Sequence, residues 1–329
     1  MCVFKKKSLI MCTTPLQAVI AERIISLNED QYFDVIFLTS VDNEKHRYYF
    51  DRLNKLTEQG VYYLSSRGSN FSYLMSFINF KAIINKELKL GAYENLYLAS
   101  IDSRFFHYII SVNNSSRVYT FDDGAANIVK NSIYYNEDNP RLLKRILWKF
   151  LGVNIYMGDV IKISKKHFTI YDKLSNIIKN TETLTLFNRK DSDFCFEGED
   201  FIIYLGQPVE ELVEDFNFKS LEQFLIRKNV KYYFPHPREK NIPKFDNLRV
   251  VQSCKIFEDY LLDMIEQKKI CKIKVYSFLS SALLNVKGFP SVEVFFIHDF
   301  KIYEKYVKFY REMNHTFFIE NISIINEGE

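Results

Sequence analysis

The stretch Arg117-Val118-Tyr119-Thr120-Phe121-Asp122-Asp123-Gly124 decides the expected fold, because an apolar, β-rich run ends directly in two acidic residues and a glycine. A second stretch of the same kind, Val230-Lys231-Tyr232-Tyr233-Phe234, ends in Pro235-His236-Pro237-Arg238-Glu239. Each stretch places ionisable side chains where a buried strand emerges into a loop. Ligands bind at these carboxyl ends of strands in open α/β sheets. The two stretches therefore predict the two halves of one active site.

The rest of the chain alternates β-rich runs with helical patterns, which is typical of parallel sheets with helices on both faces. In the first half we expect strands at 8–12, 33–40, 61–65, 95–100 and 117–121, and helices at 16–26, 44–58, 73–88 and 104–111. In the second half we expect strands at 201–205, 231–234, 248–251, 273–278 and 292–297, and helices at 220–227 and 256–266. This pattern predicts an α/β protein with two doubly wound domains that face each other across a cleft.

A polar interval between Lys179 and Glu199 separates the two series, so we predict domains at 1–190 and 191–329. The 329 residues are 47% hydrophobic, enough to bury two cores. The net charge of +3 is too nearly balanced to indicate a nucleic-acid partner. The sequence contains no G-x-G-x-x-G or P-loop pattern, which argues against dinucleotide oxidoreductases and P-loop enzymes.

The five cysteines are odd in number and scattered, without the spacing of a zinc site or a disulfide framework. Lys5-Lys6-Lys7 precedes an apolar run that is too short for a signal peptide. No stretch approaches the roughly 20 apolar residues that span a bilayer. We therefore expect a cytoplasmic protein that meets the inner membrane only at its surface.

Residues 141–151 mix four basic side chains with large apolar ones at helical spacing. Such a pattern suits a helix lying on an anionic membrane surface. It also suits a core helix with a solvated basic edge, and this second interpretation is the one that the sequence favours.

His236 is the best candidate for proton transfer, because an imidazole titrates near neutral pH, with an ordinary pKa of about 6.5. Prolines on both sides remove backbone donors and hold the chain extended, so the ring is presented from a stiff strand end. A turn histidine packed between prolines explains the same residues equally well.

Asp122 and Asp123 are neighbours, and neighbouring side chains of a strand point to opposite faces. They are therefore badly placed to chelate one metal together. One of them can act as a general base while the other accepts backbone hydrogen bonds, and Gly124 frees the turn that follows. Taken alone, the motif is more often an ordinary Asp-Gly turn. Glu210 and Glu211, in the loop after the first strand of the second domain, are rival candidates for the base.

Ser280 and Ser281 follow an apolar strand and precede an apolar helical run. Hydroxyls and exposed backbone N–H groups at the start of a helix favour a phosphate. A plain N-cap, in which one serine satisfies a helix-end donor, accounts for the same pattern.

Five motifs, taken in order, resemble the bacterial lipooligosaccharide sialyltransferases of glycosyltransferase family 52. The resemblance runs from about Leu9 to Ser281, and the order of the motifs is more specific than any one of them. The motifs are Phe121-Asp122-Asp123-Gly124, Tyr204-Leu205-Gly206-Gln207-Pro208, Phe234-Pro235-His236-Pro237-Arg238-Glu239, Phe257-Glu258-Asp259-Tyr260 and Ser280-Ser281.

The resemblance implies a GT-B fold of two Rossmann-like domains, with the acceptor on the N-terminal domain and the nucleotide sugar on the C-terminal one. It implies transfer of sialic acid from CMP-sialic acid to a terminal galactose of a lipooligosaccharide or other surface glycan. Independently of the resemblance, a single in-line displacement would invert the configuration. No Asp-x-Asp metal clamp surrounds the acidic motif, so we expect transfer without a metal. By position, His236 would be the general acid on the departing phosphate and Asp123 the general base, unless Glu210 or Glu211 fills that role. The donor site would comprise Gln207, Pro237, Glu258 near the ribose, and Ser280 and Ser281 at the phosphate.

Two other functions fit the same residues. A hexosyltransferase of the family, such as a glucosyltransferase, would use another sugar nucleotide. A non-catalytic sugar-nucleotide-binding protein would keep the scaffold, although the presence of both the acidic and the histidine motifs argues against it. We expect no cofactor and no metal, with CMP-sialic acid as donor and a galactose-terminated, lipid-linked glycan as acceptor. The sequence leaves open the acceptor glycan, the linkage, and whether the chain forms a homodimer with exchanged domains.

Overall fold

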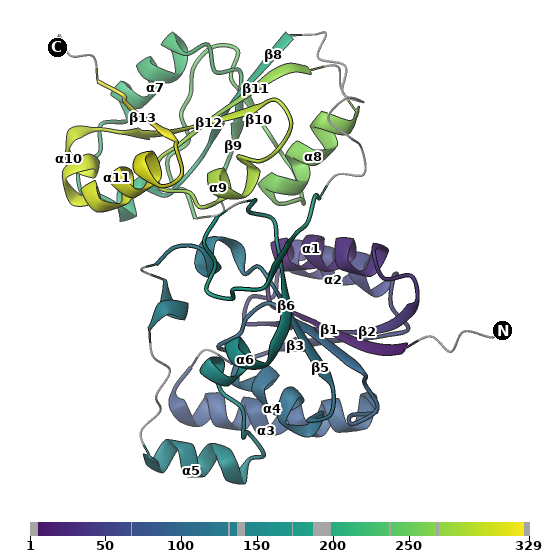
Figure 1. The fold of residues 1–329 in the computed structure, drawn as a ribbon. Coiled ribbons are helices and arrows are strands. Elements are labelled where there is room, and N and C mark those ends of the chain that lie inside the picture. The colour runs from purple at the N-terminus through teal and green to yellow at the C-terminus, as the bar shows by residue number, and fades with distance from the viewer. Residues whose placement is uncertain are drawn as a thin grey trace. The chain divides into compact units, whose positions relative to one another are not determined.

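The computed structural model describes residues 6–66, 68–130, 132–136, 142–172, 174–186, 199–236, 238–267 and 270–325. The chain divides into two compact units, Met1–Leu186 and Phe187–Glu329. This division lies inside the polar interval from which we predicted a boundary after residue 190. Each unit is built around one sheet, and helices accompany it (Figure 1).

The first unit holds a seven-stranded parallel sheet in the order β3-β2-β1-β4-β5-β6-β7. Figure 1 shows α1 and α2 on one face of this sheet and α3 and α4 on the other. Its strands are β1 Lys6–Cys12, β2 Gln31–Thr39, β3 Gln59–Leu64, β4 Asn95–Leu98, β5 Arg117–Phe121, β6 Ser164–Thr169 and β7 Thr181–Thr183. Its helices are α1 Pro15–Ser26, α2 Glu44–Asn54, α3 Asn70–Glu87, α4 Arg104–Val112, α5 Leu142–Phe150 and α6 Met157–Ile163, with short 3-10 turns η1 Gly124–Asn127 and η2 Ile133–Tyr135.

The core under α3 and α4 is aromatic. Leu9 and Met11 alternate along β1 and point to this face, where they join a buried cluster with Phe77 and Phe80 of α3. Phe105 of α4 packs its ring edge against both phenylalanines, with centroids 5.4 and 5.0 Å away. These large side chains cover the middle of the sheet and hold its strands in register.

The second unit holds a six-stranded parallel sheet in the order β10-β9-β8-β11-β12-β13. Its strands are β8 Glu199–Leu205, β9 Tyr232–Phe234, β10 Arg249–Val250, β11 Ile270–Ser277, β12 Val292–His298 and β13 Glu320–Ser323. Its helices are α7 Phe218–Arg227, α8 Phe257–Gln267, α9 Ala282–Val286, α10 Phe300–Lys305 and α11 Val307–His315, with a 3-10 turn η4 at Val209–Glu211.

Both sheets have the same topology. Numbered by their order along the chain, the strands of the second sheet and the first six of the first sheet run 3-2-1-4-5-6 in space. This is the doubly wound order, and its topological switch point lies between the first and fourth strands. The switch point falls between β1 and β4 in the first unit, and between β8 and β11 in the second. The prediction of two doubly wound α/β domains is confirmed.

Several elements were not predicted from the sequence. The edge strands β7 and β13 read Thr-Glu-Thr and Glu-Asn-Ile-Ser, and β6 begins Ser-Lys-Lys. Edge strands are commonly polar because one side of the strand is solvated, and they therefore lack the apolar run that marks a central strand. The helices α6, α10 and α11 were missed as well; two of them are seven residues or shorter. The helical run expected after Ser281 is present as α9.

The prediction that residues 141–151 form a core helix was wrong. None of the nine residues of α5 is buried, and Leu143 and Phe150 are 81% and 86% exposed. Trp148 packs against α3, with its ring centroid 4.9 Å from Phe77 and 6.2 Å from Tyr73. The sheet face in this region is already covered by α3 and α4, so α5 lies outside them. Within the described residues, no helix combines the length and apolar character needed to cross a bilayer.

Candidate active site

The loops at the switch point of the first sheet are tied together by polar side chains. Thr13 follows β1 and Ser100 follows β4, and their hydroxyl oxygens lie 2.8 Å apart. Gln17 in α1 accepts a hydrogen bond from the Thr13 N–H over 2.6 Å and donates its amide to the Ser100 hydroxyl over 3.2 Å. Sequence reasoning did not select these three residues.

Asp123, at the end of β5, joins this cluster. Its half-buried carboxylate accepts hydrogen bonds from Gln17 Nε2 at 2.5 Å, Tyr134 Oη at 2.5 Å and Ser100 Oγ at 3.3 Å. Burial raises the pKa of Tyr134, and the nearby charge of Asp123 raises it further, so Tyr134 stays protonated and keeps donating. Gly124 takes the left-handed φ of 53° that the turn was expected to require. The donors hold the Asp123 carboxylate at the carboxyl edge of the sheet.

Asp122 has a different environment. Its side chain is fully buried, and one carboxylate oxygen lies 2.9 Å from His167 Nε2 while the other accepts the Ile170 N–H over 2.6 Å. The Thr120 hydroxyl oxygen lies 2.9 Å from Nδ1, the other ring nitrogen of His167, and forms a hydrogen bond with it. Asp122 thus joins β5 to β6 and does not face the switch point. Among the described residues, no group of three or more His, Cys, Asp or Glu side chains is arranged to hold a metal.

At the switch point of the second sheet, Gln207 joins the loops that follow β8 and β11. Its side-chain oxygen accepts the Leu279 N–H over 2.6 Å. Two residues earlier in each segment, the Ser277 hydroxyl donates to the Leu205 carbonyl over 2.7 Å. Gln207, selected from the sequence as a donor-binding residue, therefore also fixes the loop that leads to Ser280.

Glu239 is the residue of this edge whose importance the sequence did not reveal. Its carboxylate accepts the Tyr233 hydroxyl and the His236 N–H, each over 2.6 Å, and also a backbone hydrogen bond from Gln207. Burial raises the pKa of Glu239 to about 7; these hydrogen bonds oppose the shift, and the charge of Glu210 adds to it.

Gly206 is required by this close approach. A Cβ atom at that position would lie 2.1 Å from a carboxylate oxygen of Glu239, so any larger residue would push the carboxylate away. The Pro-His-Pro-Arg-Glu motif contained the glutamate, but its burial becomes visible only in the fold.

His236 is half-buried at the end of β9, and its Nδ1 accepts the Arg238 N–H over 3.1 Å. A neutral imidazole that accepts through Nδ1 carries its proton on Nε2, so this hydrogen bond assigns the tautomer. Nε2 is therefore the atom of the neutral ring that can donate to a ligand. Pro237, also selected from the sequence, lies outside the described residues.

Glu210 and Glu211 lie in η4, close to the loop that carries His236. Glu210 accepts the side-chain amide of Asn241 over 2.5 Å, and Glu211 forms an ion pair of 2.8 Å with Arg238. The two partners of this ion pair are 51% and 65% exposed, and an exposed pair of this kind contributes about 0–1 kcal/mol. The structure thus brings both rival carboxylates to the same sheet edge as His236.

Ser280 and Ser281 form the turn between β11 and α9. The Ser280 hydroxyl accepts the Ala282 N–H at 3.3 Å, whereas Ser281 is exposed and makes no side-chain cap. Because α9 has only five residues and the N–H groups of its first turn are already bonded within the turn, its helix end adds little to anion binding. The hydroxyls remain the groups that this turn can offer to a phosphate.

Glu258 contacts α9, the helix that follows this turn. It is 6% exposed in the first turn of α8 and accepts the side-chain amide of Asn285, in α9, over 2.6 Å. The hydrogen bond fixes α9, and with it the serine turn, to α8. The structure therefore gives Glu258 a positioning contact beside the predicted donor site.

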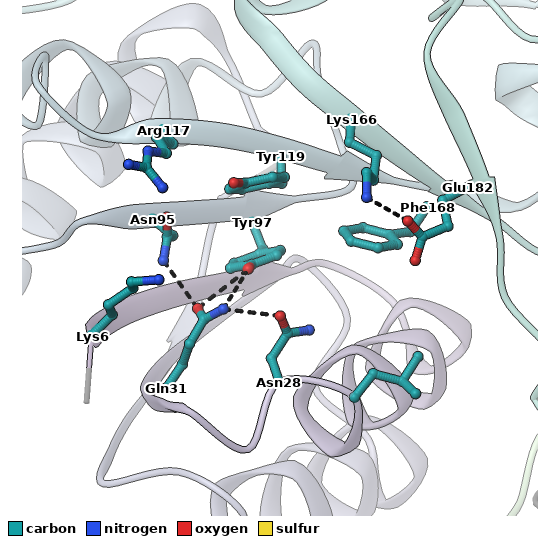
Figure 2. A pocket seen from close by; sticks show the side chains of 11 residues that line it. Lys6, Asn28, Gln31, Asn95, Tyr97, Arg117, Tyr119, Lys166, Phe168 and Glu182 are labelled. Atoms are coloured by element: carbon teal, nitrogen blue, oxygen red, sulfur yellow. Dashed lines mark hydrogen bonds and ion pairs between the residues drawn. The ribbon is translucent and has the colours of Figure 1, made fainter. Parts of the chain in front are cut away.

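A separate hollow of about 210 Å³ lies at the opposite edge of the first sheet (Figure 2). Its lining includes the first residues of three strands, Lys6, Asn95 and Arg117, and the stacked rings of Tyr97 and Tyr119, whose centroids are 4.9 Å apart. It lies at the amino ends of the strands, and ligands of doubly wound sheets bind at the carboxyl ends. We therefore do not include it in the candidate active site.

Two doubly wound domains with polar side chains at both switch points are the architecture of the GT-B fold. Solved structures support this fold at low sequence identity. The kitacinnamycin glycotransferase matches with a TM-score of 0.51 and 8% identity, over 97% of this chain and 86% of its own. Medicago truncatula UGT71G1, solved with UDP-glucose, matches with a TM-score of 0.50 and 12% identity, over 99% and 87%.

The chain belongs to glycosyltransferase family 52, whose family model matches residues 30–300. It is 31% identical to the CMP-N-acetylneuraminate:β-galactoside α-2,3-sialyltransferase of Pasteurella multocida, over 85% of this chain and 87% of that protein. It is 30% identical to the N-acetyllactosaminide α-2,3-sialyltransferase of Haemophilus influenzae, over 88% and 91%. A Neisseria meningitidis protein with the same name as the Haemophilus one is 27% identical, over 91% and 80%. The family resemblance seen in the motifs is confirmed.

The contacts of Glu239 generate a prediction with a defined sign. Its pKa rises on folding from the ordinary 4.5 to about 7, so the folded protein binds more protons than the unfolded chain between these values. Stability from this group is therefore lost as the pH rises from about 4.5 to 7. Glu239→Gln cannot titrate, and the melting temperature of the wild type should fall relative to this variant across that window.

The same variant should lower turnover by roughly 10²-fold, because the His236 and Gln207 N–H groups lose their charged acceptor and the imidazole shifts. Glu304→Gln, an exposed glutamate of α10, is the matched control and should change neither property. If the melting temperatures of the wild type and Glu239→Gln change in parallel with pH, and the variant keeps wild-type turnover, then Glu239 does not position His236.

Proposed function

We propose that the protein is an inverting sialyltransferase that transfers sialic acid from CMP-sialic acid to the terminal galactose of a surface glycan. The observation that carries the proposal is that a chain of family 52 has His236, Gln207 and the serine turn at the carboxyl edge of one sheet. The names of the three relatives supply the donor and acceptor classes, because all are sialyltransferases of β-galactosides or N-acetyllactosaminides.

In this mechanism the second unit stabilises the leaving group. CMP departs with negative charge on one phosphate, so a single compact set of donors suffices. The Nε2–H of His236 donates to the phosphate as the bond to the sugar breaks, and the hydroxyls of Ser280 and Ser281 bind the phosphate oxygens. Gln207 lines the donor site, and Glu258 holds the serine turn on the side of the ribose.

The reaction is one in-line displacement at the anomeric carbon. The galactose hydroxyl oxygen forms a bond to that carbon on one face while the phosphate oxygen leaves from the other, which inverts the configuration. The hydroxyl proton passes to a carboxylate, for which we propose Asp123. Its hydrogen bonds to Gln17, Tyr134 and Ser100 hold the carboxylate at the carboxyl edge of the first sheet. Glu210 and Glu211 are the alternatives, since both lie close to the His236 loop.

We further propose that transfer needs no metal, because the Asp122 and Asp123 carboxylates are committed to different partners. The acceptor in this proposal is lipid-linked, as in lipooligosaccharide biosynthesis. A lipid-linked acceptor would bring the enzyme to the cytoplasmic surface of the inner membrane as a peripheral protein. A homodimer is compatible with this arrangement.

The choice of donor tests the function directly. CMP should raise the melting temperature and inhibit competitively, whereas UDP and GDP at equal concentration should do so weakly, because ligands stabilise by mass action. Ser280→Ala and Ser281→Ala should each weaken CMP binding by about 1–3 kcal/mol, the cost of losing a hydrogen bond to a charged group. Transfer should persist in EDTA. Strong stabilisation by UDP with none by CMP would replace the sialyltransferase by a hexosyltransferase.

A second experiment assigns the acid and the base. His236→Ala should lower turnover by roughly 10²–10⁴-fold with CMP binding retained, the usual contribution of general acid–base catalysis. Asp123→Asn should be far more damaging to transfer than Glu210→Gln or Glu211→Gln. Asp122→Asn serves as a structural control and should mainly lower the melting temperature, because it breaks a fully buried pair. A severe Glu210 or Glu211 variant beside a mild Asp123→Asn would move the base to the second unit.

A further inference from the structure

The helix α5 exposes the side that an ordinary surface helix would bury. Five large apolar side chains of α5 are 44% to 86% exposed: Leu142, Leu143, Ile146, Leu147 and Phe150. At 100° per residue these five fall on one stripe, with Leu142 and Leu147 at its two edges. Trp148 lies on the opposite side and packs against α3.

The fold holds α5 in this orientation. The helix ends in a Schellman turn, in which the Val153 N–H bonds the Trp148 carbonyl at 2.9 Å and the Gly152 N–H bonds the Lys149 carbonyl at 3.0 Å. Gly152 supplies the left-handed φ of 92° that this turn needs, and Val153 beyond it is fully buried. Lys81 of α3 donates to the Leu151 carbonyl over 2.5 Å. The exposed stripe is therefore a property of a firmly anchored helix.

The charges of α5 complement an anionic surface. Lys149 lies next to Leu142 at one edge of the apolar stripe, and Lys144 lies next to Leu147 at the other, while the helix contains no acidic residue. Arg145 is the third basic residue and stacks on Tyr156, with its guanidinium carbon 5.5 Å from the ring centroid. An apolar stripe flanked on both sides by lysines matches the acyl boundary and phosphate groups of a bilayer.

A second copy of the chain fits this surface less well. In a two-fold contact the same patch meets itself, so α5 would face the lysines of its partner without any acidic residue on the helix to pair with them. The apolar area would be covered, but like charges would be brought together.

We propose that α5 is a docking helix for an anionic membrane surface, with its apolar stripe in the acyl boundary and Lys144 and Lys149 at the lipid phosphates. This proposal deepens the proposed function, because it rests on transfer to a lipid-linked acceptor and names the surface that reaches it. Binding to the bilayer is nevertheless a property of α5 alone and can be measured without any transfer.

Flotation with vesicles of phosphatidylcholine, with and without phosphatidylglycerol, tests the proposal. The wild type should float with the anionic vesicles and much less with phosphatidylcholine alone. Leu143→Ser/Phe150→Ser should lower partitioning by at least about tenfold, because each large apolar side chain that leaves water contributes roughly 1.5–3 kcal/mol. Lys144→Glu/Lys149→Glu should have an effect of at least the same size, since each basic residue near such a surface contributes about 1 kcal/mol. The four positions are exposed, so both variants should fold and keep wild-type melting temperatures.

Two matched controls lie in the second unit. Phe300→Ser/Phe318→Ser removes phenylalanines that are 73% and 82% exposed, and Lys301→Glu/Lys308→Glu reverses two exposed lysines. Both should float like the wild type. Equal flotation of the α5 variants and the wild type would overturn the proposal. So would a wild-type dimer, seen by light scattering, that Leu143→Ser/Phe150→Ser converts to a monomer with unchanged flotation, because α5 would then cover a second copy.

Transfer to a water-soluble galactoside separates this proposal from the proposed function. The α5 variants should transfer to the soluble acceptor at the wild-type rate and lose rate only with a vesicle-embedded acceptor. A wild type that floats but transfers to neither acceptor would contradict the proposed function and leave the docking helix in place.

Discussion

Backbone groups beyond a topological switch point have no neighbouring strand to bond with, and this constraint shapes the carboxyl edge of the sheet in each unit. The loops after the first and fourth strands diverge there, so side chains have to supply the missing partners. In the second unit Gln207 accepts the Leu279 N–H, and Glu239 accepts the N–H groups of Gln207 and His236. In the first unit Gln17 accepts the Thr13 N–H and continues the network to Asp123. The residues that satisfy the backbone also hold Asp123 and His236 at the carboxyl edges of their sheets.

This arrangement has an energetic cost that points to function. A carboxylate that is largely removed from water, such as Glu239, is disfavoured in its charged form, and its pKa of about 7 records this cost. The close approach to Gly206 and the hydrogen bonds to three donors keep the group in place despite it. These contacts hold the backbone at His236 in place. The Nδ1 atom of His236 accepts the Arg238 N–H, so in the neutral ring Nε2 carries the proton. General acid catalysis depends on such fixed geometry more than on any single strong contact.

The sequence predicted the central strands because an apolar run is a local signal, and the same signal placed the two polar motifs directly after β5 and β9. Apolar runs mark strands buried on two faces, and β5 was predicted with its observed bounds. The two aspartates were expected to differ, but which of them points inward depends on His167, 45 residues further along the chain. The burial of Glu239 and the outward face of α5 were out of reach for the same reason. Both depend on which surfaces are already covered by other helices and strands. A local sequence pattern does not indicate which surfaces these are.

The most direct test of the account is the imidazole nitrogen spectrum of protein labelled with ¹⁵N-histidine. The chain has six histidines, and the signals of His236 can be assigned by their absence in His236→Gln. Without ligand, His236 should show the tautomer protonated at Nε2. Addition of CMP should shift its Nε2 signal saturably, with UDP at the same concentration leaving it in place. A protein that binds CMP, as shown by saturable shifts at other signals, while His236 stays unmoved would contradict the assignment of the phosphate site to the switch point of the second sheet.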